Sequence, residues 1–274
     1  MKFTKMHGLG NDYIYINDMV EKCDNYSELA IILSDRHKGI GGDGIITIGK
    51  SDKADFFMQI YNADGSKGEM CGNGIRCVGK YVYDNGLTNK TSLDIETIAG
   101  IKHLDLNIVD GKVESVKVDM GVPTCHDGSD LSINKIKHEI NGYTVYDISM
   151  GNPHTVTFVD NITDQMVLKD GPVMENDSYY SNRTNVEFIK IINNNEIDMR
   201  VWERGSGETM ACGTGACASA VATMLLNDYR GTIIVHLLGG DLKITWLNNN
   251  HVIMEGSATK VYDGEFKIQD IINN

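Results

Sequence analysis

The sequence contains little of what marks a membrane, secreted or nucleic-acid-binding protein. It has no run of 18 apolar residues that would span a bilayer, and no apolar signal-peptide stretch follows its first residues. Basic residues are also scarce, because 25 Lys and Arg stand against 38 Asp and Glu, which gives a net charge of −13. Since an acidic surface repels phosphate, nucleic acid is not an expected partner. We therefore expect a cytoplasmic protein that has no membrane partner.

Cysteine pairs of the metal-binding kind are also missing. The six cysteines lie at positions 23, 71, 77, 125, 212 and 217, and the close pairs are spaced C-x5-C and C-x4-C. Zinc knuckles and thioredoxin-like redox sites show C-x2-C instead, so we expect no metal. In a reducing compartment these cysteines should be free thiols.

Helical segments are few, and strand-like segments dominate. Short β-rich runs such as 13–16, 45–48 and 56–60 recur along the chain, and Asp110-Gly111 is a strong hairpin signal. Helices are expected near 27–33, from about 72 to 84, and from about 213 to 227. The last segment is apolar on nearly every face, which is typical of an enclosed helix. We therefore predict an α+β fold in which a curled, mainly antiparallel β-sheet wraps around a central helix.

The two longer helices are preceded by similar segments. Met70-Cys71-Gly72-Asn73-Gly74 opens the first helix, and Met210-Ala211-Cys212-Gly213-Thr214-Gly215 opens the second. This shared Cys-Gly-Asn/Thr-Gly pattern indicates an internal duplication. We predict two pseudo-symmetric domains: residues 1–118 carrying Cys71, joined by a returning tail of about 262–274, and residues 119–261 carrying Cys212.

A cysteine at the start of a helix is an unusual thiol. The first backbone N–H groups of a helix lack internal partners and the helix dipole is positive there, so both favour the thiolate. The flanking glycines leave those N–H groups uncovered, so that a carboxylate can bind them. If two such helix starts face each other, one thiolate can remove a proton from a carbon and the opposite thiol can return one. Fixed N–H dipoles would stabilise the carbanion-like state, by roughly 3–4 kcal/mol per donor.

The remaining cysteines lack this context. A lone Cys is more often a small buried hydrophobic residue than a catalyst, and we interpret Cys23, Cys77, Cys125 and Cys217 in this way. At 100° per residue, Cys77 and Cys217 also point away from the helix faces that carry Cys71 and Cys212.

Beyond these features, the chain resembles the diaminopimelate epimerase family from end to end. The resemblance rests on several motifs in order, which are residues 5–13 (KMHGLGNDY), 35–44 (DRHKGIGGDG), 61–66 (YNADGS), 70–77 (MCGNGIRC), 150–154 (MGNPH), 185–186 (NV), 202–205 (WERG) and 211–216 (ACGTGA). The Met-Cys-Gly-Asn-Gly segment is moderately specific alone, and the whole set at these spacings is very specific.

The resemblance implies a cofactor-independent epimerase that interconverts LL- and meso-diaminopimelate on the bacterial lysine and peptidoglycan route, with Cys71 and Cys212 as the two bases. It implies that His154 and Glu203 tune the thiols. A zwitterionic substrate suits side chains that both donate and accept hydrogen bonds. The substrate-binding residues that the resemblance implies are Asn11, Asn62, Gly72, Asn73, Asn152, Asn185, Glu203, Arg204, Gly213 and Thr214. It also implies a homodimer with Tyr262 at the contact.

Some features separate this chain from relatives of the same superfamily. Where some family members carry Gln, this chain has Gly44, so we assign no substrate contact there. Proline racemases resemble Met-Cys-Gly-His rather than the Asn73-containing motif, and proline has no distal carboxylate for Arg204 to hold. The sequence also leaves open a thiol redox switch, in which the two cysteines form a disulfide, and a pure amino-acid-binding module.

Overall fold

The structure is a computed structural model that describes residues 1–267. The described residues form two compact units: Met1–Val118 together with residues 256–267 make up the first, and Asp119–Glu255 make up the second. The chain thus returns to the first unit earlier than the expected residue 262, because β18 (Thr259–Glu265) pairs with β1 (Lys2–Gly8). The end of the expected tail, residues 268–274, lies outside the described residues.

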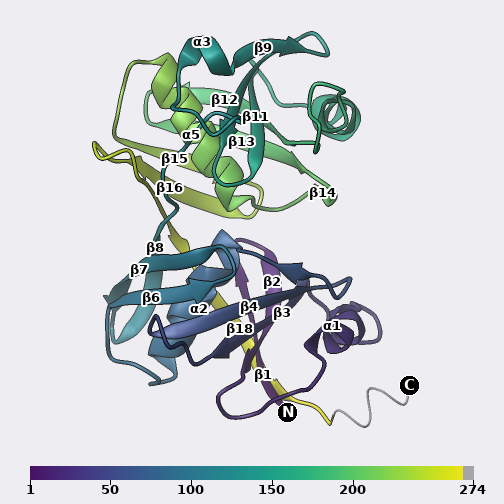
Figure 1. The fold of residues 1–274 in the computed structure, drawn as a ribbon, viewed down its shortest axis with the longest axis vertical. Helices are drawn as coiled ribbons and strands as arrows, with labels where there is room; N and C mark the ends of the chain where they lie inside the picture. The colour runs from purple at the N-terminus through teal and green to yellow at the C-terminus, as the bar shows by residue number, and fades with distance from the viewer. Residues whose placement is uncertain (268–274) are drawn as a thin grey trace. The chain divides into compact units, whose positions relative to one another are not determined.

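The first unit is a curled mixed sheet with the helix α2 (Gly72–Asp84) against it (Figure 1). Two neighbouring pairs in the sheet, β2–β3 and β4–β6, are parallel, whereas β18–β1, β1–β2, β3–β4, β6–β7 and β7–β8 are antiparallel. The short β5 (Lys67–Gly68) extends β4 just before α2 begins. In spatial order the strands are β18, β1, β2 (Asn11–Asn17), β3 (Gly44–Gly49), β4 (Phe56–Asn62), β6 (Ser92–Thr97), β7 (Gly100–Val109) and β8 (Lys112–Asp119).

The second unit repeats this pattern around α5 (Gly213–Leu226) (Figure 1). Its parallel pairs, β11–β12 and β13–β15, occupy the same places in the order, and the short β14 (Gly207–Glu208) extends β13 as β5 extends β4. Each unit is therefore a mainly antiparallel sheet curled around one helix, as predicted. The strands are β9 (Lys137–Ile140), β10 (Tyr143–Ser149), β11 (Pro153–Phe158), β12 (Asn185–Asn193), β13 (Glu196–Glu203), β15 (Thr232–Leu237), β16 (Gly240–Trp246) and β17 (Val252–Ser257).

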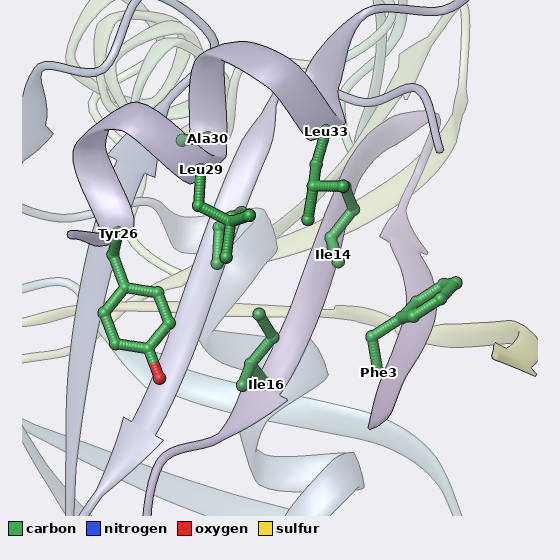
Figure 2. Close-up of a cluster of buried hydrophobic side chains, with 8 residues drawn as sticks. Phe3, Ile14, Ile16, Tyr26, Leu29, Ala30 and Leu33 are labelled. Carbon is green, nitrogen blue, oxygen red and sulfur yellow. The ribbon is translucent and has the colours of Figure 1, made fainter. Parts of the chain in front are cut away.

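The parallel pairs need crossover connections, and helices supply them. In the first unit α1 (Tyr26–Ser34) links β2 to β3, and the Asn25 side chain caps it by accepting a hydrogen bond from the Glu28 N–H. Figure 2 shows the inner face of α1 packed on the strands, where Leu29 and Leu33 lie over Ile14 and Ile16. The sequence predicted this helix near residues 27–33.

The equivalent connection in the second unit was not predicted. It contains a π-helical turn, η1 (Met166–Asp170), followed by α4 (Gly171–Glu175). A further short helix, α3 (Ile133–Ile136), was also missed. Pro172 and Gly171 interrupt the helical pattern in the sequence, and the segment becomes helical because Val167 and Met174 are buried in the core of this unit.

The two central helices begin and end close to the expected positions. α5 is apolar on nearly all sides, and its residues from Gly215 to Thr223 are buried on every turn. α2 has a polar side as well, but Ile75, Val78 and Val82 are buried. None of the described helices is long and apolar enough to cross a membrane.

Candidate active site

The first helix start is organised around Cys71, which is the N-cap residue of α2. Its extended backbone places Sγ where it accepts the N–H of Gly74 at 3.3 Å. The thiol donates to Oδ1 of Asn11 at 3.2 Å, and the Asn11 amide nitrogen in turn donates to Asp43 at 2.7 Å. The predicted residues Cys71 and Asn11 are therefore in contact within the first unit. Because Asp43 accepts from the Asn11 NH2 group, the amide oxygen is the end that faces the sulfur.

A charged network behind Asn11 was missed by sequence reasoning. Arg36 reaches Asp12 at 2.7 Å and Asp43 at 3.0 Å, and Lys5 lies 2.5 Å from Asp12. Burial raises the pKa of Asp12, but the hydrogen bonds and charges of Arg36 and Lys5 outweigh it and lower the pKa. The motifs around residues 5–13 and 35–44 contain all of these residues, yet their pairing depends on the parallel β2–β3 connection.

The second helix start is organised around Cys212, the N-cap residue of α5. Its sulfur lies 3.6 Å from Thr214 Oγ1, and its side chain is buried. Burial and the nearby carboxylates of Glu203 and Glu187 raise the pKa of this thiol well above its ordinary value, although the Gly215 N–H and the Thr214 hydroxyl act in the opposite direction. The helix start acts in the expected direction at Cys212 through the Gly215 N–H, but the net shift of the pKa is upward. At this site desolvation and two negative charges exceed the effect of the helix end.

His154 lies next to Cys212 and is fully buried in β11. Its Nδ1 is 2.7 Å from Oε1 of Glu187 on β12, and its Nε2 is 3.1 Å from Oδ1 of Asn152. The Asn152 amide nitrogen donates to Thr214 at 3.3 Å, so it joins the histidine to the first turn of α5. The structure therefore brings together Asn152, His154, Cys212 and Thr214 of the predicted set.

Glu187 belongs to the same cluster and was not predicted. Ligand-type atoms of His154, Glu187 and Cys212 all lie within 4.8 Å of one another. The signal in the sequence was that Glu187 is the single charged residue in the otherwise apolar run 186–189. On a strand with alternating faces it shares its face with the apolar Ile189, which points to a buried position. Glu203, at the end of β13, accepts a hydrogen bond from Thr209, and burial raises the pKa of its carboxyl group.

The expected substrate-binding residues differ in how they are held. The Asn185 amide is engaged at both ends, since it donates to Pro153 O at 2.8 Å and accepts the backbone N–H of Arg204 at 2.9 Å. In this arrangement Asn185 positions the Arg204 backbone. The exposed Arg204 guanidinium donates to the carbonyl of Asn182 at 3.2 Å. Asn62, at the end of β4, donates to Ser66 Oγ at 3.0 Å.

The remaining predicted residues lie at helix starts or on the surface. Gly72 and Asn73 are buried in the first turn of α2, and Gly213 is buried at the start of α5. Tyr262 is exposed on β18 and stacks edge-on against Phe3 with ring centroids 5.9 Å apart.

The other cysteines mostly behave as expected, because Cys77, Cys125 and Cys217 are buried. Burial raises the pKa of Cys77 to about 11, which keeps that thiol protonated at neutral pH. Cys23 departs from the expectation, since it is only partly buried where it packs against the hydrophobic residues between α1 and the sheet.

Gly44 permits no side chain, because a Cβ atom there would collide with the Tyr61 carbonyl oxygen.

Comparison with known proteins gives a consistent match along the whole chain. The family model described as diaminopimelate epimerase matches residues 3–126 and 146–261. A diaminopimelate epimerase of Agathobacter rectalis is 52% identical, and the match covers 98% of this chain and 100% of that protein. A diaminopimelate epimerase of Methanococcus maripaludis is 49% identical with the same coverage.

Solved structures share the fold at much lower sequence identity. A phenazine biosynthesis protein of the PhzF family from Bacillus anthracis has a TM-score of 0.70 at 17% identity and covers 98% of this chain and 99% of its own. A probable proline racemase from Agrobacterium radiobacter has a TM-score of 0.70 at 14% identity, with 97% and 93% covered. These two likenesses establish the two-unit fold.

Proposed function

Because the chain belongs to the diaminopimelate epimerase family, we propose that it inverts the α-carbon of LL-diaminopimelate to give meso-diaminopimelate, with Cys71 and Cys212 as its two acid/base residues. The observation that carries this proposal is the duplicated helix start. Each unit places a cysteine as the N-cap of its central helix, next to the backbone N–H groups of the first helical turn. The pathway role in bacterial lysine and peptidoglycan synthesis follows from that product.

The proposed reaction needs no cofactor. One sulfur, as thiolate, takes the α-proton and becomes a thiol, and the electron pair of the broken C–H bond stays on the substrate as a carbanion. The other sulfur breaks its S–H bond, gives its proton to the opposite face of the carbon, and becomes a thiolate. We propose that the two helix starts approach one α-carbon from opposite sides, and that their N–H groups hold the adjacent carboxylate and stabilise the carbanion.

The polar residues around each cysteine fit a substrate with two carboxylates and two ammonium groups. We propose that the starts of α2 and α5 bind the reacting carboxylate and that the Arg204 guanidinium binds the distal one. His154 and Glu203 would set the protonation of Cys212, since both lie in its buried surroundings. The residues proposed to contact the substrate are Asn11, Asn62, Gly72, Asn73, Asn152, Asn185, Glu203, Arg204, Gly213 and Thr214.

The function is tested by incubating the purified protein in D₂O with LL-diaminopimelate or with L-proline. We expect deuterium at the α-carbon of diaminopimelate and formation of the meso isomer, with no change in proline. Activity on proline alone would show that the substrate is wrong. Binding without deuterium incorporation would show that the protein is a binding module.

A role as a redox switch needs a separate comparison. If Cys71→Ser kept full epimerase activity but lost a response to oxidants, the cysteines would act as a redox switch and not as the acid/base residues of the reaction.

We also propose that the protein forms a homodimer with Tyr262 at the contact. Sedimentation at micromolar concentration should show a dimer, and a protein that stays monomeric there would contradict this assignment.

A further inference from the structure

Glu187 is a fully buried carboxylate in the second unit, and the reaction proposed for the two cysteines gives it no role. Its Oε1 lies 2.7 Å from His154 Nδ1, and both side chains have no exposed surface. Its second oxygen, Oε2, is buried and has no hydrogen-bond partner among residues 1–267. A buried carboxylate with one unsatisfied oxygen costs stability, so its retention beside a cysteine requires a reason.

The surroundings of the imidazole define where its protons lie. Nδ1 faces a carboxylate oxygen, and Nε2 faces Oδ1 of Asn152 at 3.1 Å. The Asn152 amide is oriented by its NH2 group, which donates to Thr214. Both ring nitrogens face oxygen acceptors, so the geometry suits a proton on each of them. An imidazolium held by the Glu187 carboxylate fits this arrangement, and both side chains are fully buried.

From this geometry we propose that Glu187 is a positioning residue, which orients His154 and holds the proton on its Nδ1, so that Cys212 can pass through its thiolate form during turnover. This inference deepens the proposed function and rests on it. The arrangement follows the logic of a reactive thiol beside a histidine that a third group orients.

The charges around Cys212 explain why the positioning matters. Burial together with the Glu203 and Glu187 carboxylates raises the pKa of Cys212, so the resting sulfur is a thiol. When it donates its proton to the carbanion, a thiolate forms in buried surroundings, and the adjacent imidazolium balances that charge. When it acts as the base, the thiolate takes the α-proton and the thiol returns. Besides His154 and Glu187, the titratable groups of this cluster are Cys212 and Glu203, and Asp147 and His126 lie close enough to interact electrostatically with Glu187.

Within the described part of the chain, the first unit offers no such pair at the matching place. The ideal Cβ position of Gly215 is 2.6 Å from Glu187 Oε1, whereas that of Gly74 is 2.6 Å from Ile46 Cδ1. Glu187 and Ile46 thus occupy corresponding positions under the two helix starts. Any effect of Glu187 on catalysis should therefore pass through Cys212 and leave Cys71 unaffected.

The test is Glu187→Gln in two backgrounds, with deuterium exchange at the substrate α-carbon as the readout. In Cys71→Ala the residual exchange depends on Cys212, and Glu187→Gln should lower it by about 10-fold or more. In Cys212→Ala the residual exchange depends on Cys71, and the same substitution should change it by less than about 2-fold. Equal losses in both backgrounds would overturn the proposal, because general damage to the fold does not distinguish the two sulfurs.

A second readout does not depend on activity. In ¹⁵N-histidine-labelled wild-type protein at pH 7.5, both ring nitrogens of His154 should show the signals of protonated nitrogens, and Glu187→Gln should convert one of them to an unprotonated signal. Glu175→Gln, which removes another buried carboxylate of the same unit, should leave the His154 signals in place. Glu187→Asp should keep the protonated form and recover part of the exchange.

These results separate the two proposals. Unchanged His154 nitrogen signals in Glu187→Gln would overturn the positioning role whatever the enzyme's substrate is. Absence of exchange in the wild-type protein would overturn the proposed function, and the nitrogen spectra would still decide whether Glu187 holds the proton on His154.

Discussion

The two cysteine-capped helices begin with nearly the same four residues and lie in different electrostatic surroundings. Cys71 donates to a neutral amide, Asn11, which an aspartate behind it holds in place. Cys212 lies in a buried cluster of ionisable side chains that contains Glu203, Glu187 and His154. The duplication therefore preserved the backbone geometry of an N-capped thiol, while the strands beside it diverged in charge.

This difference shows that the position at a helix start does not by itself decide whether a cysteine is a thiol or a thiolate. The helix dipole contributes about 0.3–2 kcal/mol, depending on burial. Complete burial of a charged group beside other charges of the same sign costs more, and at Cys212 it dominates. The same motif can therefore serve two different acid/base roles in one chain.

The comparison can be tested most strongly by removing each sulfur in turn. Cys71→Ala and Cys212→Ala should each lower epimerisation by at least about 10³-fold, because both protons must be transferred for inversion. Residual α-proton exchange in D₂O should persist from one substrate isomer in one variant and from the other isomer in the other. Exchange from the same isomer in both variants would contradict the assignment of one sulfur to each face.

A second test uses Asp147, a buried carboxyl group on β10 that belongs to the second unit alone. Thr155 and Tyr180 donate to it, and burial raises its pKa from 3.8 to about 6. Between these values the native state keeps a proton that the unfolded state loses, so the group's contribution to stability falls as pH rises from about 4 to 6. The loss is at most about 3 kcal/mol.

Asp147→Asn should remove this dependence. The free energy of unfolding in urea, measured from pH 4 to 7, should therefore improve relative to wild type as the pH rises. Because His126 nearby has a pKa that burial lowers, the difference between variant and wild type is the relevant quantity. Parallel pH profiles for the two proteins would show that Asp147 does not carry the effect.

The smallest expected effect comes from adding one methyl group at each helix start. In Gly215→Ala the new Cβ would meet Glu187 Oε1 at 2.6 Å and Cys212 Sγ at 3.2 Å, so we expect a loss of about 2 kcal/mol. In Gly74→Ala it would meet the flexible end of Ile46, and the better helix propensity of alanine offsets part of the strain. There we expect a change within about 1 kcal/mol.

Urea unfolding of both glycine variants measures this difference. If Gly74→Ala lowered the free energy of unfolding more than Gly215→Ala, the contact between the new Cβ and the Glu187 carboxylate would not be the more unfavourable of the two. Together with the cysteine and Asp147 variants, these measurements separate the properties that the two units share from those that belong to one.

Local patterns in the sequence predicted the elements that carry the chemistry. α2 and α5 begin at the glycines that follow Cys71 and Cys212, and the Cys-Gly-Asn/Thr-Gly pattern that predicted these helix starts is a local signal. The segment 161–184 was harder to predict, because its helical turns depend on tertiary packing, of η1 against β13 and β14 and of α4 against β12 and β13. Cys23 was expected to be buried, yet its exposure depends on where the chain leaves β2 before α1.

Partners that lie far apart in the sequence required the tertiary structure. Asn11 is 60 residues from Cys71, and His154 is 33 from Glu187. His154 and Glu187 meet because β11 and β12 are neighbouring strands, and Asn11 meets Cys71 because β2 packs against α2. No local pattern contains the resulting distances, and the elevated pKa of Cys212 depends on them.

The amino-acid sequence by itself determined that the protein has two related halves, that each half has a buried helix, and that a cysteine opens each helix. These properties depend on spacing, residue size and capping, which act between neighbours along the chain. The tertiary structure decided which charges surround each thiol and which amides are already engaged. Those properties depend on burial and on distances between strands, and they vary even where the local sequence is repeated.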